Sequence, residues 1–366
     1  MIQSKRGRII KELFSRPGIK GFLAEVDGRE ERCIAYLDLI EDISPGDEVL
    51  LNTTAMSLAL GSGGYHFIIS KVEPDGRELT PGGHIMKLRY TPLQMKVLAV
   101  EEEDSPWHET MLAADSLEGI PVLVGTLHSM LAPLCVSLAV QAGLRTVYVM
   151  TDGAALPLAF SQNVPWLKKQ ELLAGTVTCG HAFGGDLEAV NVYSALLAAR
   201  HVLQAEVIIV CMGPGIVGTG TKWGFTGVEQ GDILNAVDSL HGAPLAVPRI
   251  GFADQRERHR GISHHSLTVL ERICKAPVIV PLPFLKEPQS DYVLNQLRSA
   301  GLMEKHRICM EEASGCVTAM QTCGLRMTTM GRTIEEDRAF FLTLGAAALT
   351  AARLAAGQEP RWLRQV

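Results

Sequence analysis

The side chains best suited to chemistry fall in two places, a glycine-rich loop at 213–224 and a charged segment at 254–265. The loop directly follows the apolar run 206–212. Because glycine lets backbone amides approach an anion closely, the loop predicts an anion-binding site. The ligand-binding residues expected here are Gly213, Gly215, Gly218, Thr219, Gly220, Thr221 and Lys222.

Residues 213–218 form a literal G-x-G-x-x-G, but the other marks of a nucleotide site are missing. A dinucleotide fingerprint needs a helix that opens inside the motif and an acid at the end of the next strand. Here the next helix is expected near Val228, and the nearest strand-end acid, Asp254, comes too late. Thr221-Lys222 also inverts the end of a Walker A loop. A conventional NAD or ATP site is therefore disfavoured. Two alternatives remain: an anion-binding loop that matches no standard motif, and a tight structural turn that binds no ligand.

The charged segment holds two carboxylates, three arginines and three histidines. A serine at 263 or 266 could cap a helix over 267–275, with His264 and His265 at its positive end. That position disfavours imidazolium, so these rings are expected to be neutral, as a general base or metal ligand must be. The alternative is a solvated charged loop.

A divalent metal is a further possibility at these histidines. His259, His264 and His265 as one trio match no standard ligand spacing. A pair from this segment, joined by His128, His181 or a carboxylate from another strand end, is geometrically easier. Whether a metal binds stays open.

The elements that would position these residues alternate from about residue 93 onward. Apolar runs spaced 25–35 residues apart, with helical stretches between most of them, are typical of parallel βαβ units buried on both faces. We predict a mostly parallel, doubly wound, Rossmann-like sheet, with a β/α barrel as the alternative. The expected strands are 96–100, 120–125, 145–150, 173–180, 206–212, 244–252, 277–282 and 306–311.

Polar residues follow the expected strands far more often than they precede them. Because ligands bind at the carboxyl ends of parallel strands, these residues are expected to share one sheet edge with the glycine loop. Asp186 is also a good N-cap for a helix opening at Leu187. In the leading hypothesis His264 or His181 is the acid/base, and aspartates orient an imidazole or help to bind a metal. The residues concerned are His128, Asp152, His181, Asp186, Asp254 and His264.

Residues 1–92 differ from the rest and predict a small β-barrel or β-sandwich domain, followed by an α/β domain over 93–366. Four short β-type runs lie between turn sequences such as Val-Asp-Gly and Ser-Pro-Gly-Asp. The basic first twenty residues are interpreted as a solvated face.

Composition narrows the class of protein. A net charge of −6 gives no electrostatic reason to expect nucleic acid. The N-terminus lacks a signal-peptide core, and the apolar run 339–352 is shorter than the roughly twenty residues that span a bilayer. We interpret that run as a buried helix and expect no membrane partner. The absence of a Cys-x-x-Cys pair and the expected reduced cysteines indicate the cytoplasm.

Several stretches together resemble one family of conserved bacterial proteins, classed as a domain of unknown function. They are Leu60–Phe67, Gly180–Asn191, Gly213–Gly220, His259–His265 and Met327–Arg332. The resemblance spans nearly the whole chain and implies a bacterial, cytoplasmic protein with this two-part layout. It supplies no activity, substrate or cofactor.

The residues therefore favour a protein that binds a small phosphate- or carboxylate-bearing ligand and catalyses hydrolysis or group transfer. The rival is a non-catalytic sensor or scaffold whose N-terminal domain binds a partner. The apolar C-terminal helix could contribute to a homodimer.

Overall fold

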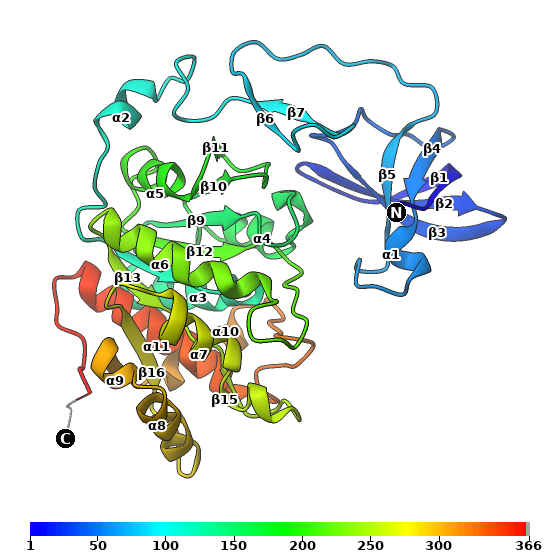
Figure 1. The fold of residues 1–366 in the computed structure, drawn as a ribbon. Helices are drawn as coiled ribbons and strands as arrows, with labels where there is room; N and C mark the ends of the chain where they lie inside the picture. The colour runs from blue at the N-terminus through cyan, green and yellow to red at the C-terminus, as the bar shows by residue number, and fades with distance from the viewer. Residues whose placement is uncertain (364–366) are drawn as a thin grey trace. The chain divides into compact units, whose positions relative to one another are not determined.

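The computed structural model describes residues 1–363, which form two compact units (Figure 1). The first unit comprises residues 1–97 together with 159–165, and the second comprises 98–158 and 166 onward. Residues 159–165 belong to the first unit although they lie between two stretches of the second, and no pattern in the sequence predicts this.

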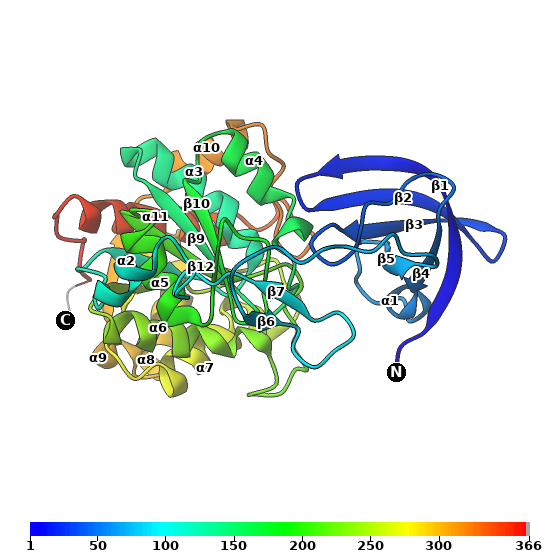
Figure 2. The same cartoon turned by 90° about the horizontal axis from the view of Figure 1, so that it is seen from above.

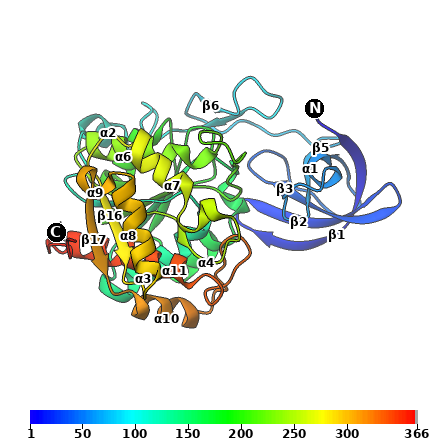
Figure 3. The same ribbon diagram turned by 60° about the horizontal axis from the view of Figure 1, so that its bottom comes forward.

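The first unit, seen beside α1 in Figure 3, is a closed five-stranded barrel. Its strand order is β1-β2-β3-β5-β4. Asp27 and Gly28, with φ of 50° and 73°, make the β2–β3 turn, as a two-residue hairpin loop requires. The expected β domain is thus confirmed. The basic N-terminal stretch forms the long strand β1, on which Arg6, Arg8 and Lys11 are exposed, as the solvated-face interpretation expects. The barrel strands are β1 (Ser4–Arg16), β2 (Ile19–Val26), β3 (Arg29–Tyr36), β4 (Glu48–Asn52) and β5 (His66–Lys71).

Two smaller elements complete this unit. The short helix α1 (Thr54–Ser57) follows β4, and β6 (Ile85–Lys87) pairs with β7 (Met95–Val97) in a separate antiparallel ribbon. The expected strand 96–100 is divided. Its first residues lie in β7 and pair with β6, whereas Ala99 makes a parallel bridge to Glu188 at the edge of the large sheet.

The second unit is built on an eight-stranded sheet in the order β11-β10-β9-β12-β8-β13-β16-β17, in which every pair of neighbours is parallel. The sheet is open at β11 and β17, so the doubly wound prediction is confirmed and the β/α-barrel alternative is wrong. The strands are β8 (Pro121–Val124), β9 (Thr146–Thr151), β10 (Gly175–Cys179), β11 (Leu187–Ala189), β12 (Val207–Met212), β13 (Ala243–Ala246), β16 (Ile279–Pro283) and β17 (Arg307–Glu311).

Helices cover both faces of this sheet (Figure 2). Three helices pack together on one face: α3 (Leu131–Ala142), α10 (Ser314–Thr322) and α11 (Arg338–Ala355). The other face is covered by α5 (Val192–His201) and α6 (Glu229–Ser239), which contact each other. The short helix α2 (His108–Ala113) packs against α5. Because both faces are covered, the central strands are apolar without alternation. The remaining helices are α4 (Asn163–Lys169), α7 (His264–Thr268), α8 (Gln289–Ser299) and α9 (Leu302–Lys305).

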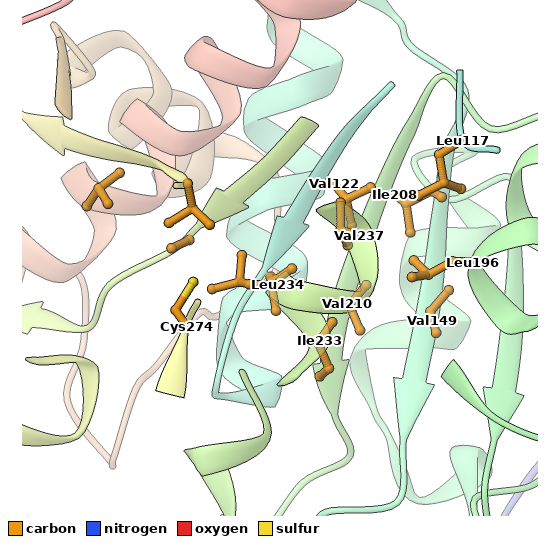
Figure 4. Packing of buried hydrophobic residues seen from close by; sticks show 14 of the residues in the cluster. Leu117, Val122, Val149, Leu196, Ile208, Val210, Ile233, Leu234, Val237 and Cys274 are labelled. Atoms are coloured by element: carbon orange, nitrogen blue, oxygen red, sulfur yellow. The ribbon is translucent and has the colours of Figure 1, made fainter. Parts of the chain in front are cut away.

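The core between the sheet and α5 and α6 is apolar (Figure 4). Val122, Val149 and Ile208 point from the strands toward Leu196 and Leu234 of the helices. On the opposite face α11 is long and apolar enough to cross a membrane by length and composition, yet 67% of its 18-residue window is buried in the protein. That burial is typical of a core helix.

The segment around residue 187 departs from the expected helix. Leu187–Ala189 pairs with Val177–Cys179 as the edge strand β11, and α5 begins later, at Val192. Its N-cap is Asn191, whose side chain accepts hydrogen bonds from the N–H groups of Tyr193 and Ser194. Asp186 is therefore not a helix cap.

Arg353→Met is expected to lower the free energy of unfolding by about 2 kcal/mol, because it removes the nearest cation from a buried carboxylate. Arg353 Nε lies 2.7 Å from Oε1 of Glu311, whose side chain is 2% exposed. Arg361, at 3.7 Å, is the remaining cation there. Urea unfolding measures the loss. The exposed Arg326→Met serves as the control and should leave stability unchanged.

Candidate anion-binding site

The loops that follow β12, β8 and β13 meet at one edge of the sheet, because these three strands are neighbours and run parallel. A cavity of about 210 Å³ lies there. We call it the Arg/His cavity. It is lined by Thr126, Leu127, Ile216, Val217, Gly218, Gly220, Phe225, Gly227, Arg249, Arg256, Arg258, His259, Ser263, His264, His265 and Met330.

The glycine loop folds back on itself as a small hairpin. Thr219 N–H donates to the carbonyl of Gly224 at 2.8 Å, and Thr226 N–H donates to that of Val217 at 2.9 Å. Gly218 lies opposite Phe225 between these two bonds, in a non-hydrogen-bonded pair. In such a pair the N–H and C=O point away from the partner strand, so the amide of Gly218 is directed out of the hairpin.

Most polar groups expected to hold the anion serve the loop itself. The hydroxyls of Thr219 and Thr221 lie 2.9 Å apart, and the Thr221 hydroxyl also accepts from the N–H of Gly224. Lys222 lies over the ring of Trp223 at 5.8 Å. Within the described chain, the expected ligand residues that line the cavity from this loop are Gly218 and Gly220. Gly213, Gly215 and the three polar side chains lie outside its lining.

Two glycines of the loop differ in what a side chain would meet. A Cβ on Gly213 would lie 2.4 Å from the carbonyl oxygen of Ala155, whereas one on Gly218 would lie 3.4 Å from Cε1 of His265. Gly213→Ala should therefore cost about 2 kcal/mol of stability through forced backbone movement. Gly218→Ala should leave stability nearly unchanged and weaken anion binding. Thermal unfolding and calorimetric titration of the pair check this; equal destabilisation by both would contradict it.

The charged segment is held as the tip of a second hairpin. β14 (Ile250–Gly251) pairs with β15 (Gly261–Ile262), and a 3-10 turn (Glu257–His259) lies between them. Ser263 then caps α7 by accepting a hydrogen bond from the N–H of Ser266. The expected cap is present, although the regular α-helix is shorter than 267–275 and passes into a π-helical turn (Val269–Ile273).

This geometry gathers three imidazoles. The ring centroids of His264 and His265 are 4.0 Å apart, and His259 lies 5.1 Å from His264 and 5.6 Å from His265. The ring of His265 also stacks on Phe225, with centroids 4.0 Å apart and planes 12° apart. The histidines of the charged segment thus form one cluster against the glycine loop.

Each of these histidines has a buried nitrogen with no hydrogen-bond partner in the described chain: Nδ1 of His259 and Nε2 of His264 and of His265. Burial, reinforced by neighbouring positive charge, lowers the pKa of His259 and that of His265 to about 4. Burial and Arg258 lower the pKa of His264 as well. All three rings are therefore neutral at pH 7 and keep an unused donor or acceptor.

Positive charge surrounds these rings. Arg249, Arg256 and Arg258 line the cavity, and no carboxylate is among its lining residues within the described chain. The nearby Asp254 accepts two hydrogen bonds of 2.9 Å from the Arg256 guanidinium, which holds the pKa of that carboxyl well below its usual range. The same carboxylate has Arg332 at 3.9 Å. Asp254 therefore pairs with arginines and does not orient an imidazole, the role that the sequence predicts for it.

Arg249 is the most buried of these cations. Its side chain is only 10% exposed, and its ion-pair partner, Asp254, is 3.9 Å away and already bonded to Arg256. Burial and the nearby Arg332 lower the pKa of Arg249, whereas the carboxylates of Asp337 and Asp254 oppose the shift. Its backbone is fixed by bonds to Ser263 and Ser266. Both carboxylates pair more closely with another arginine, Asp254 with Arg256 and Asp337 with Arg332. A buried guanidinium with so distant a share of counter-charge is costly unless an anion completes it.

A family model described as "Protein of unknown function (DUF3866)" matches residues 32–348. The chain belongs to this family. The matched range contains every residue that lines the Arg/His cavity. Searches of curated proteins and of solved structures found no match.

The metal hypothesis gains no geometric support in this DUF3866 protein. Among residues 1–363, no three His, Cys, Asp or Glu side chains are arranged to hold a metal ion. The charge of the cavity argues the same way, since three arginines repel a divalent cation and attract an anion.

The other predicted site residues lie outside the cavity lining. His128, just after β8, contacts the Tyr148 hydroxyl through Nδ1 at 3.3 Å, and burial lowers its pKa to about 4. Asp152 and His181 lie together after β9 and β10, where Asp152 accepts the backbone N–H of His181 at 2.9 Å. They form a separate group at the same sheet edge.

Asp186 is at the wrong end of the sheet for the proposed site. It precedes β11 and accepts hydrogen bonds from the N–H and hydroxyl of Thr176, at the amino end of β10. Lys168 pairs with its carboxylate at 2.6 Å. The expectation that Asp186 shares an edge with the glycine loop is therefore wrong, because 187–189 is a strand that Asp186 enters rather than a helix that follows a strand.

Two residues with functional potential were missed. Arg249 was hidden inside the expected strand 244–252, although β13 ends at Ala246. Glu229, in the first turn of α6, accepts a hydrogen bond from the Thr151 hydroxyl at 2.6 Å; burial raises its pKa to about 7, with Asp152 adding to the shift. The sequence does carry a signal for Arg249, since this charged residue directly follows the apolar run 244–248.

Proposed function

We propose that this protein binds a small phosphate- or carboxylate-bearing anion in the Arg/His cavity. The observation that carries the proposal is Arg249, a nine-tenths buried guanidinium at the cavity wall whose ion-pair partner, Asp254, is 3.9 Å away and already bonded to Arg256. Arg258 and the outward amide of Gly218 would complete the anion's hydrogen bonds. The neutral histidines would supply further donors.

Titration of the purified protein with sulfate tests this proposal, because sulfate stays a dianion throughout the useful pH range. We expect saturable binding by calorimetry and a rise in unfolding temperature that chloride at equal ionic strength does not reproduce. No saturable binding of sulfate, phosphate or simple carboxylates would refute it.

Hydrolysis or group transfer on the bound anion is the catalytic form of this proposal, with His264 as the general acid/base. Its unpartnered Nε2 and lowered pKa suit proton acceptance near neutral pH. A metabolite panel scored for thermal shift and for product by mass spectrometry tests it. His264→Ala should abolish turnover and leave the unfolding temperature nearly unchanged; stabilisation without product would favour a sensor.

We further propose a cytoplasmic location, with no nucleic-acid or membrane partner, and a homodimer. Most apolar residues of α11 are buried in the core, so the dimer interface would lie elsewhere. The net charge of −6 and the eight free cysteines support the location and the absence of nucleic acid. Size-exclusion chromatography with light scattering tests the homodimer.

A further inference from the structure

Building on the proposed anion site, we infer that the natural ligand is an amphipathic organic anion, with its charged group at the arginines and an apolar body against the glycine loop. The cavity has two chemically different walls. The segment that begins at Arg249 supplies the cationic wall. Ile216, Val217 and Phe225, with Leu127 after β8, supply the apolar one.

The apolar wall is more exposed than packing requires. Val217 is 58% exposed and Met330, which also lines the cavity, is 57% exposed. Leu127 and Phe225, which belong to the same wall, are buried, with 5% of each residue exposed. A ligand body that covered these side chains would remove apolar surface from water, which favours binding roughly in proportion to the area.

The two walls meet at His265. One face of its ring stacks on Phe225, while its Nε2 is a buried polar atom without a partner in the described chain. An inorganic ion held by Arg249 and Arg258 would leave the apolar side chains facing water. A ligand with an apolar group attached to its anion would contact both walls at once, as ligand sites with few polar anchors generally do.

Two matched pairs of probes test the inference: inorganic phosphate against phenyl phosphate, and acetate against benzoate. Each pair shares its kind of anionic group and differs in the apolar body. In at least one pair we expect the aromatic member to bind about tenfold tighter, the factor expected when roughly 60 Å² of apolar surface leaves water. The pair that shows the preference identifies the anionic group.

Val217→Ser should bring that affinity ratio toward one, because it removes an exposed apolar side chain from the wall and leaves the core intact. Val140→Ser is the matched control, since Val140 is 55% exposed on α3, away from the cavity, and its ratio should equal that of the wild type. Equal affinities within both pairs, with sulfate still bound, would overturn the inference and leave the proposed function standing. Failure of every probe, sulfate included, would overturn the proposed function itself.

Discussion

Arg249→Met is expected to weaken sulfate binding about 100-fold or more while leaving the unfolding temperature unchanged or slightly higher. Loss of binding follows because the buried guanidinium would make the main charge-assisted hydrogen bonds to the anion. Stability is spared because a buried charge is costly in the unliganded protein and methionine fills a similar volume. The neighbouring carboxylates of Asp254 and Asp337 also keep Arg256 and Arg332 as partners. Calorimetric titration and thermal unfolding measure the two effects.

Arg200→Met is the control for this substitution. Arg200 pairs with Glu118 at 2.5 Å outside the cavity, so its replacement should leave sulfate affinity unchanged. If Arg249→Met instead lowered stability by several kcal/mol and kept sulfate binding, Arg249 would be a structural residue and the anion site would lose its main support.

Sulfate should bind about tenfold tighter at pH 5 than at pH 7.5, with net uptake of protons. In the unliganded cavity burial and positive neighbours lower the pKa of His259 and of His265 to about 4. A bound dianion beside these rings would raise both pKa values toward their ordinary level of about 6.5. The complex then holds protons that the free protein lacks, so affinity rises as pH falls through this window.

The same shifts predict acid sensitivity of the unliganded protein. Because the folded pKa values lie below the unfolded one, the unfolded state binds more protons between about pH 6.5 and 4. Stability is full above pH 6.5 and falls as pH decreases to about 4, by about 1 kcal/mol for each of His259 and His265 after allowance for solvent screening. Sulfate should offset this loss.

Titrations in two buffers of different ionisation enthalpy count the protons taken up. His259→Gln and His265→Gln should each reduce the count and the pH dependence. His201→Gln is the control, because His201 bonds to the carbonyl of Ser116 at 2.7 Å and lies outside the cavity lining. Sulfate affinity independent of pH would show that these imidazoles do not contact the anion.

Much of the fold was predictable because its signals are local. Fully apolar runs between helical stretches indicated a parallel sheet covered on both faces, and most of the expected strands are present in it. The weaker local signals misled. Leu187–Ala189 was interpreted as helix, since three residues carry too little pattern to show an edge strand, and the helix signal of 192–201 extended over them.

For the candidate site, the sequence identified the two segments but not which of their side chains face the cavity. It placed a glycine loop after one strand and a charged segment after another, and the parallel order of the strands brings both to one edge. It credited Thr219, Thr221 and Lys222 with binding, although the hydroxyls close the loop and the lysine lies over Trp223. Hydrogen bonds inside a loop depend on its backbone path, which spacing does not reveal.

The sequence by itself determined that a glycine loop and a histidine- and arginine-rich segment end neighbouring parts of a parallel α/β sheet, because strand periodicity and turn chemistry are local properties. Only the tertiary structure decided that Asp254 pairs with Arg256 at 2.9 Å, that Asp186 lies at the opposite edge, and that the buried Arg249 has Asp254 only at 3.9 Å. Burial and charge pairing arise from residues distant in sequence, so the charge balance of the cavity is set by the packing around it.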